Sequence, residues 1–331
     1  MNDAMIIVRA VHFAAVIAVT GVAFFLAFIA DPAPAFGPAG NNASLRAMLR
    51  LRLAAIAWIG LALAVASGAA WLVVTAAEMS GRPLADVFPQ GILWIVLLHT
   101  GFGRDWLARA ALAGLLAAAF VPLMSPSRGK STSIKGAAAV SAAGFAGSLA
   151  WAGHAVGATG IQGIVHPAAD VLHLIAAAAW VGALVPFALL LAAAECDTAL
   201  LAIARSATAR FSTLGIASVA TLLVTGSVNT YYLAGSVAAL TETDYGRLLL
   251  AKVALFFVMV ATAAVNRLRL RPQLAADATG SIKHAALREL RRNTMIEVVI
   301  GMAIIAIVVM LGITPPGLHE QNYELRITEL R

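Results

Sequence analysis

The chain has 331 residues, of which 61% are hydrophobic and 12% are charged, with a mean hydropathy of +0.89 and a formal net charge of +7. A soluble globular domain is about 45–50% apolar and about 25% charged, so this composition excludes an ordinary soluble domain. In lipid, a helix satisfies its own backbone hydrogen bonds. We therefore predict an all-α polytopic membrane protein.

Eight apolar segments approach or exceed the roughly 20 residues that a helix needs to cross a bilayer. In chain order they are 5–29, 53–77, 106–124, 136–155, 168–193, 213–233, 248–265 and 295–313. A shorter apolar stretch at 87–99 contains Pro89 and Gly91, and we expect it to form an interfacial helix.

Basic residues are distributed unevenly between the two sides of the membrane that this order defines. Most of the 23 Lys and Arg residues follow the first, third, fifth and seventh segments, whereas the opposite loop 156–169 contains none. Basic loops face the cytoplasm, so we expect both termini on the outer side. The net charge then reflects topology and contact with membrane lipids, not nucleic-acid binding. We expect the basic stretch 283–292 to lie on anionic lipid.

The two halves of the chain share a pattern. The first span contains V-H-F-A-A-V-I-A-V-T-G and the fifth contains L-H-L-I-A-A-A-A-W-V-G, which aligns His12 with His173 and Gly21 with Gly182. The third span opens with G-R-D-W-L-A-R and the seventh with G-R-L-L-L-A-K. We predict eight transmembrane helices built as two four-helix repeats, related by an axis along the membrane normal.

This repeat sets the expected organisation of the chain. It consists of a first repeat at 1–135 with spans one to three and the interfacial helix 87–99, a fourth span and outer loop at 136–167, a second repeat at 168–313 with spans five to eight, and an outer tail at 314–331.

Every histidine except His284 maps to the outer side of the membrane or the nearest half of a span. Histidine is costly in lipid and is a common ligand of copper and zinc. We therefore predict an outer metal site, in which a carboxylate binds the metal or orients an imidazole. Its candidate ligands are His12, His154, His166, Asp170 and His173. Alternatively, these residues only hydrogen bond to water and helix ends at the membrane surface.

Two further pairs of polar residues belong to this hypothesis. Arg9 and Asn229 are expected beside the ligands, and an Arg9–Asp170 pair is expected to close the mouth of the site. Glu297 and Asn266 are candidates for an inner relay of a proton or metal, although a helix N-terminus also stabilises a carboxylate such as Glu297.

A haem site is the main alternative to a copper site. Helical bundles with histidines at matched depth can ligate haem, so His12 and His173 are compatible with one haem b near the outer face. The sequence contains no P-loop, G-x-G-x-x-G or H-E-x-x-H motif, and we do not expect an enzyme.

Several sequence blocks are similar to a known family. The blocks H-L-I-A-A-A-A-W-V-G-A-L, T-G-S-V-N, Y-G-R-L-L-L-A-K and N-R-L-R-L-R-P resemble the CopD family of bacterial copper-resistance inner-membrane proteins. The resemblance implies an eight-span protein that handles periplasmic copper together with a periplasmic copper-binding protein. By position, His12, His154 and His173 match histidines of the family motifs.

The expected function follows from this resemblance and from the outer histidines. We expect a copper homeostasis protein of the bacterial inner membrane, with periplasmic termini, that binds copper as Cu(I) or Cu(II) and carries it inward. The alternatives are a haem b electron-transfer protein and a membrane scaffold for a periplasmic copper chaperone.

Overall fold

A computed structural model describes residues 2–30, 43–125, 128, 131–152, 160–234, 236–274 and 280–314. Every regular element in these ranges is a helix. The elements are α1 (Asn2–Phe24), η1 (Phe25–Ile29), α3 (Ala43–Ser80), η2 (Leu84–Asp86), α4 (Ile92–His99), α5 (Gly101–Leu123), α6 (Thr132–Gly147), η4 (Ser148–Ala152), α7 (Gln162–Cys196), α8 (Thr198–Ala234), α9 (Val237–Glu242), α10 (Asp244–Val265), η5 (Asn266–Leu270), α11 (Arg271–Gln273) and α12 (Gly280–Leu311).

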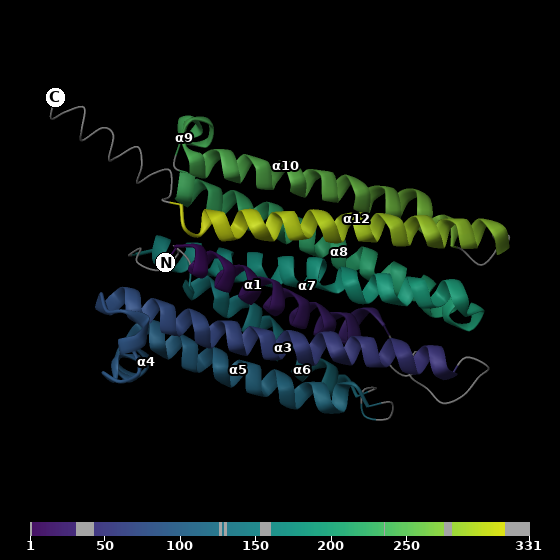
Figure 1. Ribbon diagram of the computed structural model, residues 1–331. Helices are drawn as coiled ribbons and strands as arrows, with labels where there is room; N and C mark the ends of the chain where they lie inside the picture. The colour runs from purple at the N-terminus through teal and green to yellow at the C-terminus, as the bar shows by residue number, and fades with distance from the viewer. Residues whose placement is uncertain are drawn as a thin grey trace.

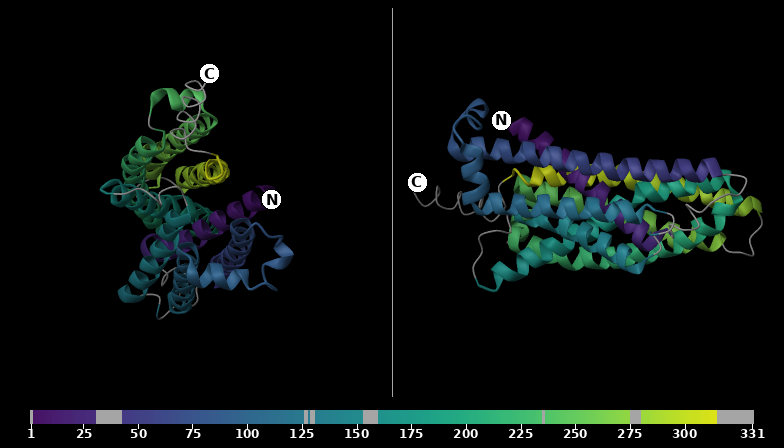
Figure 2. Two further views of the ribbon diagram at one scale, coloured as in Figure 1. Left: turned by 90° about the vertical axis from the view of Figure 1, so that its left-hand side faces the viewer. Right: turned by 90° about the horizontal axis from the view of Figure 1, so that it is seen from below.

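The long helices lie side by side in one bundle with α1 and α7 at its centre (Figures 1 and 2). Helices α3, α5 and α6 lie on one side of this central pair, and α8, α10 and α12 lie on the other. The protein buries 67% of the most apolar window of both α1 and α7, against 11% to 39% for the other long helices. The central pair therefore connects the two halves of the chain.

Seven of the described helical segments are long and apolar enough to cross a membrane. They confirm the predicted all-α polytopic membrane protein, with about seven candidate spans. The remaining expected span, 136–155, coincides with α6, which has 16 residues and continues into η4. This helix is shorter than the roughly 20 residues that a spanning helix needs.

The candidate spans are longer at the basic end of the bundle than the sequence predicted. Helix α8 begins at Thr198 instead of 213, and α12 begins at Gly280 instead of 295. The stretch 283–292 is therefore part of α12. Its buried side chains, Leu287 and Leu290, and the Arg291–Glu195 ion pair at 3.2 Å attach it to the bundle.

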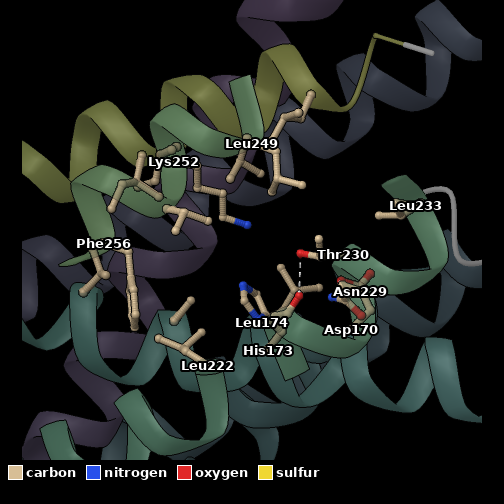
Figure 3. A pocket seen from close by; sticks show the side chains of 18 of the residues that line it. Asp170, His173, Leu174, Leu222, Asn229, Thr230, Leu233, Leu249, Lys252 and Phe256 are labelled. Carbon is tan, nitrogen blue, oxygen red and sulfur yellow. Dashed lines mark hydrogen bonds between the residues drawn. The ribbon is translucent and has the colours of Figure 1, made fainter. Parts of the chain in front are cut away.

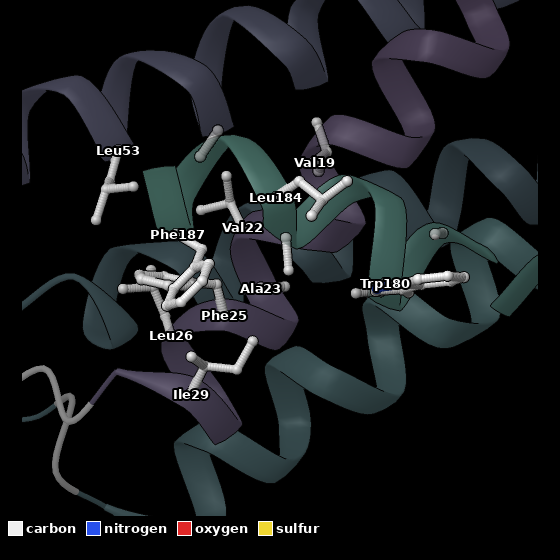
Figure 4. Packing of buried hydrophobic residues seen from close by; sticks show 14 of the residues in the cluster. Val19, Val22, Ala23, Phe25, Leu26, Ile29, Leu53, Trp180, Leu184 and Phe187 are labelled. Atoms are coloured by element: carbon white, nitrogen blue, oxygen red, sulfur yellow. The ribbon is translucent and has the colours of Figure 1, made fainter. Parts of the chain in front are cut away.

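Helices α1 and α7 cross with their backbones in contact. A Cβ atom on Gly21 would collide with the backbone of Gly182, and one on Gly182 would collide with the carbonyl oxygen of Ile17. Close approach through small residues is a common way to associate helices in membranes. Just beyond the crossing, large apolar side chains fill the space between the helices (Figure 4). They include Phe25, Leu26, Leu184 and Phe187.

A short helix precedes both α5 and α10, and the first of these, α4, lies within the stretch 87–99 where the sequence predicts an interfacial helix. Thr100 accepts a hydrogen bond from Gly103 N at 3.0 Å and donates one to Val96 O at 2.6 Å. Thr243, between α9 and α10, makes the same two bonds at the same distances with Gly246 N and Ala239 O. These N-caps fix the start of α5 and α10 identically.

Candidate functional site

One face of α7 carries three polar side chains near the end of the bundle at which α1 begins. His166, Asp170 and His173 follow each other at intervals of four and three residues, which places them on one side of the helix. All three line a cavity of about 650 Å³ enclosed by α1, α7, α8, α10 and α12 (Figure 3). The structure therefore brings together three of the five predicted ligands.

The imidazole of His173 is held in one orientation and one tautomer. Its Nδ1 lies 3.0 Å from Thr225 Oγ1, and the Thr225 hydroxyl donates its proton to the carbonyl of Thr221 at 2.7 Å. Since that hydroxyl can then only accept from the ring, Nδ1 carries the hydrogen and Nε2 has a free lone pair. A metal-binding histidine is typically held in this way by its other nitrogen.

Charges of both signs surround His173. Asp170 accepts a hydrogen bond from Asn229 Nδ2 at 3.2 Å. The Lys252 ammonium points into the cavity (Figure 3) and interacts electrostatically with Asp170 and His173. Asn229 Oδ1 is buried and has no hydrogen-bond partner in the described part of the chain. This end of the cavity therefore offers one carboxylate, one unprotonated imidazole nitrogen, one amide oxygen and the ammonium of Lys252, and Arg9 lines the same cavity.

His166 and the side opening complete the cavity. The buried ring of His166 stacks on Tyr232 with 5.2 Å between the ring centroids. Exposed side chains of α8 and α10, among them Tyr231 and Phe257, also line the cavity. The space between these two helices therefore opens sideways, toward the surface that lipid covers in a membrane.

The inner part of the cavity is apolar. Leu222, Phe256, Met259 and Gly301 line it. Trp180 also lines it, and its buried indole N–H has no hydrogen-bond partner among the described residues. This part of the cavity therefore lacks the charged groups that surround His173.

His12 lies in a different place, among α1, α3 and α5. Its Nδ1 is 3.0 Å from the carbonyl oxygen of Ala64 and 3.1 Å from Ser67 Oγ. A carbonyl can only accept, so Nδ1 again carries the hydrogen, and the buried Nε2 has no partner in the described ranges. Trp71 and Trp106 enclose the ring at centroid distances of 5.6 and 5.3 Å.

Two guanidinium groups lie beside the His12 pocket. Arg109 stacks over Trp106 at 4.6 Å and donates to Ser148 Oγ at 3.2 Å. Arg9 stacks over Trp71 at 4.9 Å and donates to Gly312 O at 3.0 Å. Arg9 also lines the His173 cavity, but its recorded hydrogen bond goes to Gly312 and not to the expected partner, Asp170.

The structure does not bring His12 and His173 to a shared site. Each lies nine residues before the glycine at which α1 and α7 cross. Nine residues are about 2.5 helical turns, so both rings point away from the crossing, into separate pockets. His154 lies outside the described residues. Within the described ranges, no three His, Cys, Asp or Glu side chains form a group that could hold a metal ion.

A polar cluster lies between α10 and α12, one turn beyond the inner end of the cavity. Buried Glu297 accepts a hydrogen bond from Asn266 Nδ2 at 2.8 Å, and Asn293 Nδ2 donates to Asn266 Oδ1 at 2.9 Å. Asn266 begins the π-helix η5, a type of irregularity that is frequent at functional sites. Since Glu297 precedes the cavity-lining Gly301 by four residues, both lie on one face of α12.

Comparison with known proteins identifies the family. Residues 1–164 match the model described as copper resistance protein D-like, N-terminal domain, and residues 205–311 match the model of copper resistance protein D. Copper resistance protein D of Pseudomonas syringae pv. tomato is 32% identical over 272 residues, which cover 81% of this chain and 84% of the relative. The chain belongs to the copper resistance protein D family.

Two further relatives place this member of the copper resistance protein D family in a membrane. Inner membrane protein YebZ of Escherichia coli is 30% identical over 94% of this chain and 98% of its own length. Copper transport protein CutJ of Bacillus subtilis is 29% identical over 71% of this chain and 42% of its own length. No solved structure matches. The family predicted from the sequence blocks is confirmed, and the protein is a multi-pass inner-membrane protein.

Proposed function

We propose that this protein binds copper at the periplasmic face of the inner membrane and moves it toward the cytoplasm. The relatives named for copper resistance and copper transport support this assignment. The observation that carries it is the free Nε2 of His173, in a cavity that also contains His166 and Asp170.

Copper is the substrate in this proposal, and its ligands are few. Imidazole binds copper in both common oxidation states, and a carboxylate adds an oxygen ligand that suits Cu(II). A transported ion must bind strongly enough to enter and weakly enough to leave, so an incomplete ligand set suits transport better than storage. His154 is a further proposed ligand, and a periplasmic copper-binding protein is the proposed donor.

His12 is a weaker candidate for a copper ligand than the family motif implies. Its Nε2 is free, as in His173, but Arg9 and Arg109 flank its pocket. Two guanidinium groups raise the free energy of a nearby metal cation in a medium of low dielectric constant. We therefore assign copper entry to the His173 cavity, and we keep His12 as a second candidate for the same test.

The inner end of the proposed route is the Glu297–Asn266 pair. An ionisable residue within a membrane span is by default a candidate for a functional site. Glu297 lies one turn beyond the cavity and is positioned by Asn266. We propose that copper or a proton passes this carboxylate before it reaches the cytoplasm.

The proposed topology has eight spans, with α6 and η4 forming the fourth, and two repeats with periplasmic termini. Matched structural features support the repeat. His12 with Ser67 corresponds to His173 with Thr225, and the Thr100 cap corresponds to the Thr243 cap. The beginning of α1 and the end of α12 lie at the same end of the bundle (Figure 1).

Copper binding and copper uptake together test the proposal. Purified protein is titrated with Cu(I) and with Cu(II) against chelators of known affinity, and cellular copper is measured after expression of the same variants. We expect His173→Ala to lose both activities. The matched control is His99→Ala, because His99 is exposed at the outer end of the bundle and does not line the cavity.

Unchanged copper binding and uptake in His173→Ala would refute the proposed entry site and would support a scaffold for a copper chaperone. An optical spectrum of the reduced protein tests the haem alternative. A Soret band that disappears in His173→Ala would replace the copper proposal with a haem b protein.

A further inference from the structure

The basic end of the bundle contains a second hollow, between α8 and the end of α10. We call it the arginine groove and define it by Arg205, Ser206, Arg267, Leu268 and Arg271. It has a volume of about 840 Å³. Arg205 and Ser206 come from α8, whereas the other three come from η5 and α11. Two segments of the second half that are separated in the chain by α9 and α10 therefore enclose one groove.

Within the described ranges, the charges that line the arginine groove are all positive. Three of its lining side chains are guanidinium groups, and none of the described ones is acidic. Nearby carboxylates are engaged elsewhere, since Glu289 pairs with Arg269 and Arg292. Like charges around one hollow repel each other in the absence of an anion. Arginine forks match the oxygens of a phosphate group.

One of the three arginines is already held in position. Arg267 Nη1 donates a hydrogen bond to Ser212 Oγ at 2.7 Å, which connects η5 to α8. This bond uses one of the five N–H groups of the guanidinium. Arg205 and Arg271 line the groove together with Arg267. The groove is therefore preorganised for an anion.

Apolar side chains border the arginine groove on the side that leads along α8 toward the large cavity. Leu268, in the groove, is 73% exposed. Ile216 follows Arg205 by about three helical turns, so it lies on the same face of α8, and it is also exposed. Leu223, another two turns along that face, lines the lateral opening of the large cavity. An apolar track therefore leads from the arginines along α8.

We propose that the arginine groove binds the phosphate headgroup of an anionic phospholipid, with an acyl chain along α8. Basic pockets between helices at the cytoplasmic side are suited to such headgroups. A free phosphate ion would use the arginines but would gain nothing from the exposed Leu268 and Ile216. This site is independent of the copper proposal, since none of its residues lines the large cavity.

Native mass spectrometry of the full-length protein in detergent tests the proposal, with phosphatidylglycerol, phosphatidylcholine and inorganic phosphate as the probes. We expect bound phosphatidylglycerol and little of the other two. The double variant Arg205→Gln/Arg271→Gln should bind phosphatidylglycerol about tenfold more weakly or worse, from the usual contribution of a basic residue near anionic lipid. Arg267 is left unchanged because it joins η5 to α8.

The matched control is Arg210→Gln/Arg288→Gln, which removes the same charge from exposed arginines outside the groove. An equal loss in both double variants would show general charge attraction and overturn the site. If Arg205→Gln/Arg271→Gln binds phosphatidylglycerol as strongly as the unmodified protein does, the proposed site is overturned as well. Binding of inorganic phosphate that displaces the lipid would assign the groove to a free anion and refute the lipid. Arg205→Gln alone, at an exposed position, provides a variant with minimal risk to folding.

Discussion

The pockets of His12 and His173 present the same imidazole in two different electrostatic settings. In each, a hydroxyl on the next long helix holds Nδ1 and leaves Nε2 free. His12 is enclosed by two tryptophans beside two guanidinium groups. His173 faces a cavity that Arg9 also lines, but this cavity contains a carboxylate, Asp170, beside the ammonium of Lys252. The orientation of a histidine therefore does not decide whether a cation can bind, because the neighbouring charges decide it.

The backbone contact between α1 and α7, which lies between the two histidine pockets, can be disrupted by one substitution. Gly182→Ala places a methyl group against the carbonyl of Ile17 and the backbone of Gly21. We expect a loss of about 3 kcal/mol or more in the free energy of unfolding, since overpacking against a backbone cannot be relieved by rotamer changes. Thermal unfolding in detergent measures it.

The control for this substitution is Gly114→Ala, an exposed helical position where a Cβ meets nothing within 4 Å. It should be neutral or stabilise the helix by up to about 1 kcal/mol. Equal effects at Gly182 and Gly114 would contradict the backbone contact.

The two histidines should differ sharply in their effect on copper. We expect His173→Ala to weaken copper binding by more than about a hundredfold, because it removes a ligand. We expect His12→Ala to change copper affinity by less than about threefold and to lower stability, because it opens a void among packed aromatic rings. Equilibrium copper titration and thermal unfolding of both variants separate these effects. If His12→Ala weakens copper binding more than His173→Ala does, the copper site is the His12 pocket and not the His173 cavity.

Removal of the hydroxyl that holds each imidazole ring should affect copper binding differently in the two pockets, by a smaller factor than removal of the histidines. Thr225→Val keeps the shape of the side chain but removes the acceptor for Nδ1, and we expect copper binding to weaken about tenfold to a hundredfold. Ser67→Ala is the matched change at His12 and should leave copper binding nearly unchanged. If both variants bind copper as the unmodified protein does, the orientation of the His173 ring has no part in binding.

The charges beside His173 should act in opposite directions. Asp170→Asn removes a negative charge and should weaken copper binding, whereas Lys252→Met removes a positive charge and should strengthen it. Each effect should be within about tenfold, given the shielding between charges at an open cavity. Copper titration at low and high salt measures both, and the difference should shrink at high salt. A weaker affinity in Lys252→Met would show that the ammonium supports the site through Asp170.

Several features of the site could be predicted from the sequence. His166, Asp170 and His173 were assigned to one site from the sequence, and the cavity is lined by all three. The orientation of His12 and His173 was not predicted, although the nine residues that separate each from its crossing glycine contain the information. The hydroxyls of Ser67 and Thr225 occupy aligned positions in the two halves, but only the structure shows that they hold the rings.

Other features leave little signal in a single sequence. Helices α8 and α12 begin before the apolar segments 213–233 and 295–313, because each helix continues through a polar stretch that precedes its apolar segment. The π-helix at Asn266 has no composition that distinguishes it from an ordinary helix. The cavity lies among α1, α7, α8, α10 and α12, and a single sequence does not show how elements so far apart in the chain pack together.

The glycine contact between α1 and α7 also sets the relative depth of the two imidazoles. The two backbones touch at this point, and each imidazole lies nine residues, or about 13 Å, before its glycine. The contact therefore holds His12 and His173 at the same level along the bundle, although different helices form their pockets.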